Sequence, residues 1–359
     1  MSLLQYREAL VIREKNRFGD GVLYESGDIC GDIYAACTAC MNIYSEFLTW
    51  ANAYKHRIVE RPADADSIIV LSCQVTDLSI LNDLRYLEKF HTLYPKATCY
   101  IGGCLARRFD IPLPSGVRRL VNVRADGVQI DDKSLVHYAD PFWVVNFKES
   151  DDELSDGHLF RNMYPLRISV GCSGNCTFCS IHVTRGEAYE LASNEQEFLD
   201  HDDVLLVADS PSAKLLKRWV GIATKHNKPI SIRNVEPPVA VSIVPELFEL
   251  ADKGLLKVLH CAIQSNSPEV LGDMHRPVEA TLDFIAAAMG LRRSGVTLAT
   301  CIITDYKDFP NPDMDLLYKT FHYISWNPYW DGEWDRAAAG KRWEKYLPYV
   351  AKFYTEGEE

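Results

Sequence analysis

The chain has 359 residues, of which 47% are hydrophobic and 25% charged, a balance typical of a globular protein with more than one domain. Its formal charge of −12 disfavours a large nucleic-acid partner, because binding to phosphates depends on Lys and Arg. No apolar run approaches the roughly 20 residues of a membrane span, and charges near the amino end exclude a signal peptide. We therefore expect a cytoplasmic protein without a membrane partner.

The first part of the chain predicts an α/β domain. Residues 1–28 are polar and are expected to form an extension. In residues 29–147, strands are expected at 33–36, 67–71 and 99–101, and helices at 41–54 and 78–93. Apolar runs joined by helices are typical of βαβ units. The pattern predicts a doubly wound, flavodoxin-like domain around a parallel sheet.

A second βα series follows an acidic stretch, residues 148–162, that predicts a linker. Within residues 163–325, strands are expected at 166–170, 204–208, 229–232, 258–262 and 297–303, and helices at 213–224, 245–253 and 278–293. Five or six consecutive βα units predict a partial (β/α)6 barrel of the TIM type, with functional residues at the carboxyl ends of its strands.

The last residues, 326–359, are aromatic and are expected to end in a helix at 337–354. We expect this tail to pack its tryptophans against the open barrel. The tryptophans are Trp326, Trp330, Trp334 and Trp343.

Three cysteines directly after the first strand of the second domain predict an iron–sulfur cluster. Cys172, Cys176 and Cys179 follow the spacing C-x3-C-x2-C. Thiolates ligate cubanes, which normally take four ligands, so three cysteines leave one iron open for the amino and carboxylate groups of S-adenosylmethionine (SAM). The alternative is a zinc site, but zinc sites usually combine C-x2-C pairs with a nearby fourth ligand.

The residues around this triplet resemble the radical SAM methylthiotransferases. Gly171–Cys179 with Arg185-Gly186 is similar to the family signature, and the segments 259–267 and 271–276 are similar to its "LHxPxQSGS" and "LxxMxR". The resemblance implies a methylthiotransferase-like transferase that uses SAM, 4Fe–4S clusters and an electron donor such as a flavodoxin or ferredoxin.

The resemblance also implies cofactor contacts. Phe178 is expected near the adenine of SAM, with packing at the barrel mouth as the alternative. Gln264 and Ser265 are expected to contact SAM or substrate, or else to form a structural turn. Arg185 is expected to bind cofactor or substrate, or else to pair with a carboxylate.

Members of this family carry a second cubane, ligated by three cysteines at strand ends of the amino-terminal domain. Here Cys40, Cys73 and Cys104 are 33 and 31 residues apart, one in each βα unit. The ends of neighbouring parallel strands lie together, so these thiols are expected to share an auxiliary cluster. Cys37 is the alternative to Cys40. Four other cysteines are expected to be buried or incidental thiols: Cys30, Cys99, Cys261 and Cys301.

Two departures from the family bear on the substrate. The "DxIxGFPGE" strand end is replaced by residues 301–310, which lack its glycines, so the SAM-side wall is expected to be rebuilt. The small RNA-gripping TRAM domain of the family is expected to be missing, replaced by the tail. We therefore expect sulfur or methylthio insertion at a C–H carbon of a peptide or small metabolite. The alternatives are a shortened tRNA methylthiotransferase and an enzyme whose auxiliary cluster transfers no sulfur.

Overall fold

The computed structural model describes residues 23–24, 29, 31–53, 58–120, 137–138, 144–145, 159–160, 163–193 and 195–354. The chain forms two compact units, one of residues 1–142 with 330–359 and one of residues 143–329. The predicted extension and linker lie almost entirely outside the described residues, as does Cys30. Across the described helices, none combines the length and apolar character needed to cross a bilayer.

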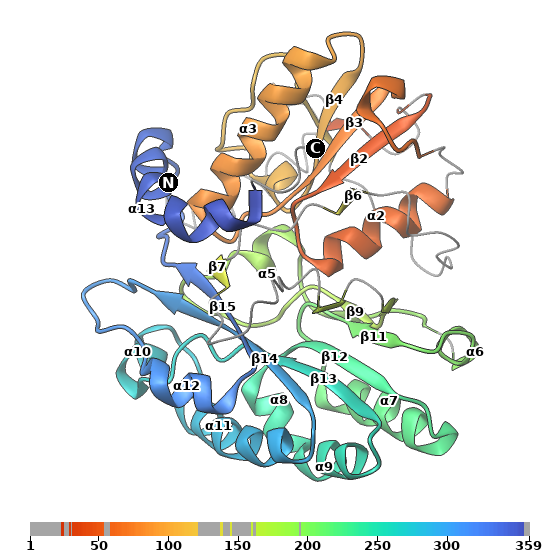
Figure 1. Cartoon of the computed structure of the whole chain (residues 1–359), viewed down its shortest axis with the longest axis vertical. Helices are drawn as coiled ribbons and strands as arrows, with labels where there is room; N and C mark the ends of the chain where they lie inside the picture. Colours follow the sequence, from red (N-terminus) through yellow and green to blue (C-terminus); the bar gives the residue numbers. More distant parts are fainter. Residues whose placement is uncertain are drawn as a thin grey trace. The chain divides into compact units, whose positions relative to one another are not determined.

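The first unit contains a parallel sheet in the order β1-β5-β4-β3-β2-β6. Figure 1 shows helices α2 and α3 on either side of this sheet. The strands are β1 (Leu23–Tyr24), β2 (Ile33–Cys37), β3 (Ser67–Ser72), β4 (Thr98–Gly103), β5 (Arg118–Leu120) and β6 (His137–Tyr138), and the helices are α2 (Met41–Ala53), α3 (Asp77–Leu93) and the short η2 (Pro62–Asp64) and η3 (Leu105–Arg107). The predicted doubly wound domain is confirmed.

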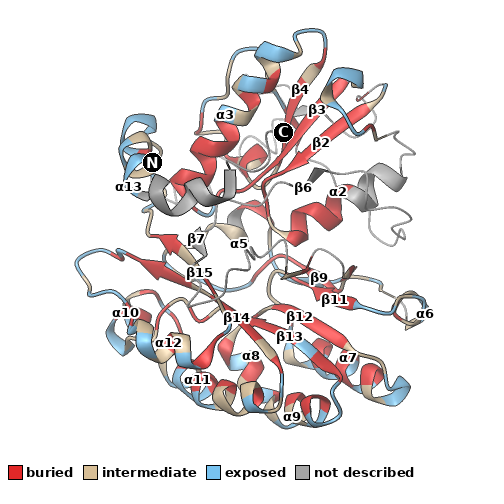
Figure 2. Cartoon of the chain, viewed as in Figure 1, coloured by how far each residue is buried: buried red, intermediate tan, exposed pale blue. Residues whose placement is uncertain are grey.

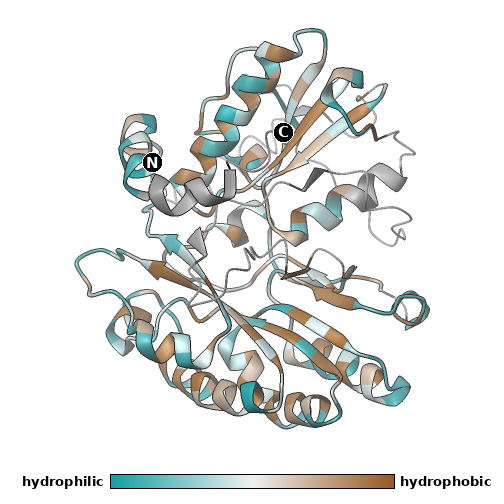
Figure 3. Ribbon diagram, viewed as in Figure 1, coloured by the Kyte–Doolittle hydropathy of each residue, from teal (hydrophilic) through white to brown (hydrophobic). Residues whose placement is uncertain are grey.

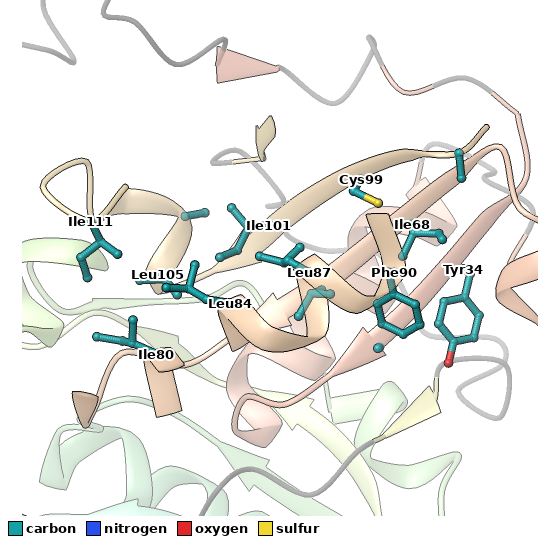
Figure 4. Packing of buried hydrophobic residues seen from close by; sticks show 14 of the residues in the cluster. Tyr34, Ile68, Ile80, Leu84, Leu87, Phe90, Cys99, Ile101, Leu105 and Ile111 are labelled. Carbon is teal, nitrogen blue, oxygen red and sulfur yellow. The ribbon is translucent and has the colours of Figure 1, made fainter. Parts of the chain in front are cut away.

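The core of this unit lies between α3 and one face of the sheet. Leu84, Leu87 and Phe90 of α3 pack over strand residues such as Ile68 and Cys99 (Figure 4). Helix α3 begins where the Thr76 hydroxyl accepts a hydrogen bond from the Ser79 N–H at 3.1 Å, which satisfies one of the free amides at a helix start. This cap fixes the helix directly after the end of β3.

The end of the chain belongs to the first unit. Helix α13 (Arg336–Tyr354) lies along α3, with ion pairs Arg336–Glu88 at 2.8 Å and Arg342–Asp77 at 3.3 Å. The ring of Trp343 lies 4.7 Å from the guanidinium of Arg85.

The tail tryptophans correct the sequence prediction. Trp330 and Trp334 pack against the core of the first unit, and Trp343 lies beside α3 of the same unit. Their predicted packing against the barrel is therefore wrong. Ion pairs between α13 and α3 hold the tail on the first unit. Trp326 lies in strand β15 of the second unit instead.

The second unit is built on a seven-stranded sheet in the order β7-β15-β14-β13-β12-β11-β8. All neighbouring strands are parallel except β7, which runs antiparallel at one edge. The strands are β7 (Val144–Val145), β8 (Tyr164–Arg167), β11 (Val204–Val207), β12 (Ile230–Val235), β13 (Leu256–Cys261), β14 (Thr297–Thr304) and β15 (Tyr323–Pro328). Six parallel strands in an open sheet form the predicted partial barrel.

Helices follow most of these strands and cover the sheet. They are α5 (Ile181–Thr184), α6 (Glu195–Leu199), α7 (Ala213–His226), α8 (Pro237–Ser242), α9 (Val244–Asp252), α10 (Pro268–Asp273), α11 (Val278–Arg293) and α12 (Met314–Thr320). Ser212, Ser267 and Asp313 cap three of them through side-chain oxygens. The buried strands are hydrophobic and the outer helix faces are exposed and hydrophilic, as Figures 2 and 3 show.

Two boundaries differ from the prediction. The expected strand 166–170 is divided, since β8 pairs with β11 whereas β9 (Ser169–Val170) turns away to pair with β10 (Tyr189–Glu190). Strand β15 crosses the expected domain boundary at residues 325 and 326, and the second unit continues to Tyr329.

Candidate iron–sulfur sites

The loop that carries Cys172, Cys176 and Cys179 joins β9 to α5. Gly171 at its start has φ +82°, and a Cβ there would lie 2.2 Å from the carbonyl oxygen of Glu187. Only glycine allows this approach without strain. The Gly171 N–H donates to Asp209 at 2.8 Å and the Cys172 N–H to Gly186 at 3.0 Å, so the backbone before the first cysteine is fixed.

Each sulfur of this triplet accepts a hydrogen bond. Cys172 Sγ accepts from the Gly174 N–H at 3.2 Å and Cys179 Sγ from the Ile181 N–H at 3.5 Å. Cys176 Sγ accepts from the guanidinium of Arg276 at 3.6 Å. All three cysteines are free thiols. Sulfurs presented to N–H donors suit thiolate ligands, so this donor set fits an iron–sulfur cluster.

Burial makes an unliganded thiolate costly here. It raises the pKa of Cys172 and, more strongly, that of Cys179. A bound metal reverses this preference because it deprotonates a coordinating thiol. Within the described residues, no three His, Cys, Asp or Glu side chains converge as they would around one metal ion.

The structure brings Cys40, Cys73 and Cys104 together at the carboxyl end of the first sheet. Cys73 follows β3, Cys104 follows β4, and Cys40 lies between β2 and α2. These three strands are neighbours in the sheet. Burial, followed by the nearby thiols of Cys104 and Cys40, raises the pKa of Cys73 well above its usual value. Val75 donates its N–H to Cys73 Sγ at 3.4 Å, so this sulfur also meets a backbone donor.

Gly103 makes the approach of Cys104 to Cys73 achievable. It has φ +75°, and a Cβ there would lie 2.5 Å from the carbonyl oxygen of Ser72. The next amide, Cys104 N–H, donates to that same oxygen at 3.1 Å. The chain therefore crosses directly over the end of β3 before it presents Cys104.

Cys37 lies at the same end of the sheet as Cys40, whereas Cys99 lies within a strand. Cys37 is the last residue of β2, fully buried, and its thiol faces the carbonyl oxygen of Ala39 at 3.7 Å. Cys99 lies in β4 and packs into the hydrophobic core beneath α3 (Figure 4). Cys261 and Cys301 lie in β13 and β14, as expected.

A buried carboxyl group connects two of the ligand-bearing segments. Asp83 of α3 is 1% exposed, and its oxygens contact the Thr38 hydroxyl at 2.5 Å and the Cys73 N–H at 2.9 Å. Burial raises the pKa of Asp83 to about 8. Thr38 lies just before Cys40, so this carboxyl group links the end of β2 to the loop after β3.

Two of the residues predicted to contact SAM, Phe178 and Arg185, contact other side chains of the barrel unit. Phe178 packs against Val270, Met274, Ile303 and Tyr306. Arg185 forms a buried ion pair with Asp209, the carboxylate that also binds the Gly171 N–H.

Gln264 and Ser265 form local contacts at the end of β13. Gln264 has φ +68°, and its side-chain amide reaches Cys301 Sγ at 3.4 Å. Ser265 is fully buried, and its hydroxyl accepts from the Ser267 N–H at 3.1 Å. These contacts are those of the alternative turn role, and binding of cofactor by either residue stays a prediction.

Three charged residues were not assigned from the sequence. Asp209 follows β11, Glu236 follows β12, and Arg276 lies beyond α10. The first two occupy the carboxyl ends of parallel strands, the position where functional residues of barrels gather, and that position is the signal that identifies them. Arg276 ends the segment similar to "LxxMxR", which marked the residue, but only the fold brings it to Cys176.

The segment after β14 adopts a strained conformation. Asp305 and Lys307 have φ +52° and +50°, values that cost energy for residues other than glycine. Between them, the Tyr306 hydroxyl donates to Asp273 at 2.6 Å, and the Tyr306 ring lies 4.6 Å from that of Tyr329. Lys307 also pairs with Asp273. This wall therefore carries aromatic contacts and an ion pair where the family has glycines.

Arg107, Arg108, Arg118 and Arg119 come closest to a basic run in the sequence, but two of the four are buried. Arg108 is 3% exposed, pairs with Asp110 at 2.7 Å and lies over the ring of Trp330. Arg119 is 5% exposed and donates to the carbonyl oxygens of Leu105, Ala106 and Ile111. Arg108 and Arg119 are therefore structural and are not part of a solvated basic face.

Comparison with known proteins supports the resemblance. No family model matches the chain. The threonylcarbamoyladenosine tRNA methylthiotransferase MtaB of Bacillus subtilis is 24% identical over 76% of this chain and 64% of its own length. A tRNA-2-methylthio-N(6)-dimethylallyladenosine synthase of Bordetella petrii is 24% identical over 75% of this chain and 62% of its own. The ribosomal protein uS12 methylthiotransferase RimO of Salmonella paratyphi B is 24% identical over 64% and 51%.

These curated relatives are methylthiotransferases, as the sequence motifs predicted. The chain spans less than two thirds of their length. Among solved structures, the radical SAM methyltransferase TsrM of Kitasatospora setae matches with a TM-score of 0.44 and 10% identity over 76% of this chain and 67% of its own. The radical SAM coproporphyrinogen III oxidase HemN of Escherichia coli matches with a TM-score of 0.31 and 11% identity over 56% of each chain. Likenesses this distant say nothing further about the site.

Proposed function

We propose that the chain is a radical SAM enzyme with two 4Fe–4S clusters that inserts sulfur or a methylthio group at a C–H carbon of a peptide or small metabolite. The observation that carries the proposal is the presence of two separate sets of three free cysteines, one at the carboxyl ends of parallel strands and one on the loop after β9, which is bonded to Asp209 at the carboxyl end of parallel strand β11. Ligand sets at such positions suit functional sites, because loops there are free to vary on a rigid sheet.

Cys172, Cys176 and Cys179 would hold the cluster that binds SAM. With SAM bound, such a cluster supplies a 5′-deoxyadenosyl radical that abstracts hydrogen from carbon. The Asp209 carboxylate holds Gly171 and Arg185, and thereby fixes the start of the ligand loop. One electron is needed for each cleavage of SAM, so a flavodoxin or ferredoxin is the proposed partner.

Cys40, Cys73 and Cys104 would hold the auxiliary cluster, which in the resembling family is tied to sulfur transfer. Asp83 bonds Thr38 and the Cys73 N–H, and Gly103 lets the chain approach the Ser72 carbonyl oxygen just before Cys104, so both residues help to position this set. Cys40 is preferred to Cys37 because, after burial, the thiols of Cys104 and Cys40, but not that of Cys37, are among the groups that raise the pKa of Cys73.

The charge of the chain supports a peptide or metabolite substrate. The net charge is −12, and in the described residues two of the four candidate phosphate-binding arginines, Arg108 and Arg119, are buried in the first unit. Affinity for RNA and its salt dependence rest on accessible Lys and Arg. Bulk tRNA is therefore expected to bind weakly near physiological salt.

Mass spectrometry of products tests the reaction. Reconstituted enzyme is incubated with SAM, a reductant and candidate peptides or metabolites, and each product mass is compared with that of its substrate. A gain of one methylthio group or one sulfur supports the proposal. Conversion without sulfur would instead assign the auxiliary cluster to electron transfer or substrate binding.

A second candidate function is methylthiolation of tRNA. The names of the relatives favour it, since MtaB and the Bordetella protein are both tRNA-modifying enzymes. Methylthioadenosine that appears in tRNA only when this protein is present would establish this function. A tight tRNA complex at physiological salt would support it independently.

A further inference from the structure

We propose that Arg276 is a positioning residue that raises the reduction potential of the cluster held by Cys172, Cys176 and Cys179, and that Glu236 opposes it. This inference rests on the proposed function, because it assumes a cluster on those three cysteines.

The position of Arg276 is fixed by the backbone and by three side-chain contacts. Its N–H donates to the carbonyl oxygen of Leu271 at 2.8 Å, which closes the turn after α10. Its side chain is 3% exposed. One terminal nitrogen contacts Cys176 Sγ at 3.6 Å and Glu236 at 3.1 Å, and the other donates to the carbonyl oxygen of Ala262.

Arg276 makes the surroundings of the three sulfurs unequal. Cys172 and Cys179 accept from neutral backbone amides, whereas Cys176 accepts from a permanent cation. Charge-assisted hydrogen bonds are roughly twice as strong as neutral ones. Hydrogen bonds to the sulfurs, net charge and burial set the potential of an iron–sulfur cluster. A buried guanidinium at one ligand therefore stabilises the reduced, more negative state.

One donor of Arg276 remains for the cofactor. Its Nε is buried and has no hydrogen-bond partner among the described residues. Burial of a donor without an acceptor is costly, and native proteins avoid it. Inorganic sulfide or a liganding thiolate supplies such an acceptor, so the unpartnered nitrogen fits a loaded cluster beside it.

Glu236 carries the opposite charge on the same side of the barrel. It follows the last residue of β12, and its side chain is 26% exposed. Its carboxylate lies 3.1 Å from the same Arg276 nitrogen that contacts Cys176 Sγ, so its negative charge is close to that sulfur. It neutralises part of the Arg276 charge and disfavours a further electron on the cluster.

The test is a potentiometric titration of full-length reconstituted protein followed by EPR. The relevant cluster is the one whose signal changes when SAM is added. We expect Arg276→Gln to lower the ratio of reduced to oxidised cluster about tenfold at a fixed potential, equivalent to about 59 mV for one electron. Glu236→Gln should raise that ratio, and Arg276→Lys should fall between wild type and Arg276→Gln.

The opposite signs separate tuning from structural damage. If breaking the ion pair merely loosened the loop, both substitutions would shift the potential in the same direction. That result, or an unchanged potential in Arg276→Gln, would overturn the inference. If Arg276→Gln retains no iron, Arg276→Lys and Glu236→Gln still show whether each charge raises or lowers the reduction potential.

A matched control and the iron content complete the design. Arg292→Gln removes an arginine of α11 that donates to the carbonyl oxygen of Tyr318, away from the cysteines, and should leave the potential unchanged. A wild-type protein with no SAM-sensitive cluster would contradict the proposed function itself, a result distinct from a cluster whose potential ignores Arg276.

Discussion

At the scale of single residues, close approaches between backbone segments determine where the candidate ligand cysteines lie. Gly103 and Gly171 each precede a cysteine, have positive φ, and leave no room for a Cβ beside a neighbouring carbonyl oxygen. The cysteines themselves were predictable because their spacing and their place after strands are visible in the sequence. Asp209, Glu236 and Arg276 were not, because they come together from different strands and loops.

Gly103→Ala should remove the auxiliary cluster selectively. The added Cβ would lie 2.5 Å from the Ser72 carbonyl oxygen, so Cys104 must move away from Cys73. We expect iron to fall from about eight to about four per chain. Gly254→Ala is the matched control, with φ +67° but no atom within 4 Å of the new Cβ. Full iron content in Gly103→Ala would contradict the assignment of Cys104.

Cysteine substitutions should distinguish ligands from core thiols. Cys40→Ser is expected to lose the auxiliary iron. Cys99→Ser and Cys37→Ser should keep it but lower the free energy of unfolding, because each buries a hydroxyl in an apolar position. Iron content and urea denaturation measure the two effects. Iron loss in Cys37→Ser alone would exchange the roles of Cys37 and Cys40.

His322 should make the second unit sensitive to acid. Burial, and then the charge of Arg292, lowers the pKa of His322, whose Nδ1 accepts the Leu298 N–H at 3.0 Å. The unfolded chain, with a histidine pKa of about 6.5, then binds more protons, so stability falls as pH drops below about 6.5. His322→Asn keeps an acceptor without titrating and should flatten this loss. Urea midpoints at several pH values measure it.

At the scale of elements, the predicted helices agree with the structure to within one or two residues. The sequence expectation for α11, residues 278–293, has the observed bounds, and α7 begins at the expected Ala213 after the Ser212 cap. The division of β8 from β9 was missed, because an apolar run does not reveal that a strand changes partners after Arg167. The packing of α13 was missed because charged pairs far apart in sequence determine it.

Trp330→Ala should destabilise the first unit. The ring covers part of its core, contacts the Arg108 guanidinium and donates its N–H to the carbonyl oxygen of Glu333 at 2.7 Å. We expect a loss of about 2 kcal/mol from apolar burial and the cation–π contact. Urea denaturation should show the change in one of two transitions. Tyr189→Ala, at a side chain 40% exposed on β10, should change stability by less than about 0.5 kcal/mol.

At the scale of the whole molecule, two ligand sets in two units predict two independent clusters. Reconstituted protein should hold about eight irons, and replacement of Cys172, Cys176 and Cys179 by Ala should leave about four. Replacement of Cys40, Cys73 and Cys104 should leave the other four. About four irons in the unmodified protein after anaerobic reconstitution would contradict the prediction of an auxiliary cluster.

Because α13 belongs to the first unit, the two units are expected to complete their folding in a fixed order during synthesis. The second unit is one continuous stretch, residues 143–329, whereas the first unit is split around it. A nascent chain emerges from its amino end, and domains generally fold as units as they appear. The barrel unit can complete its structure while the ribosome is still attached. The first unit needs Trp330, Trp334 and α13, which are synthesised after the barrel unit, so its final packing follows that of the barrel unit.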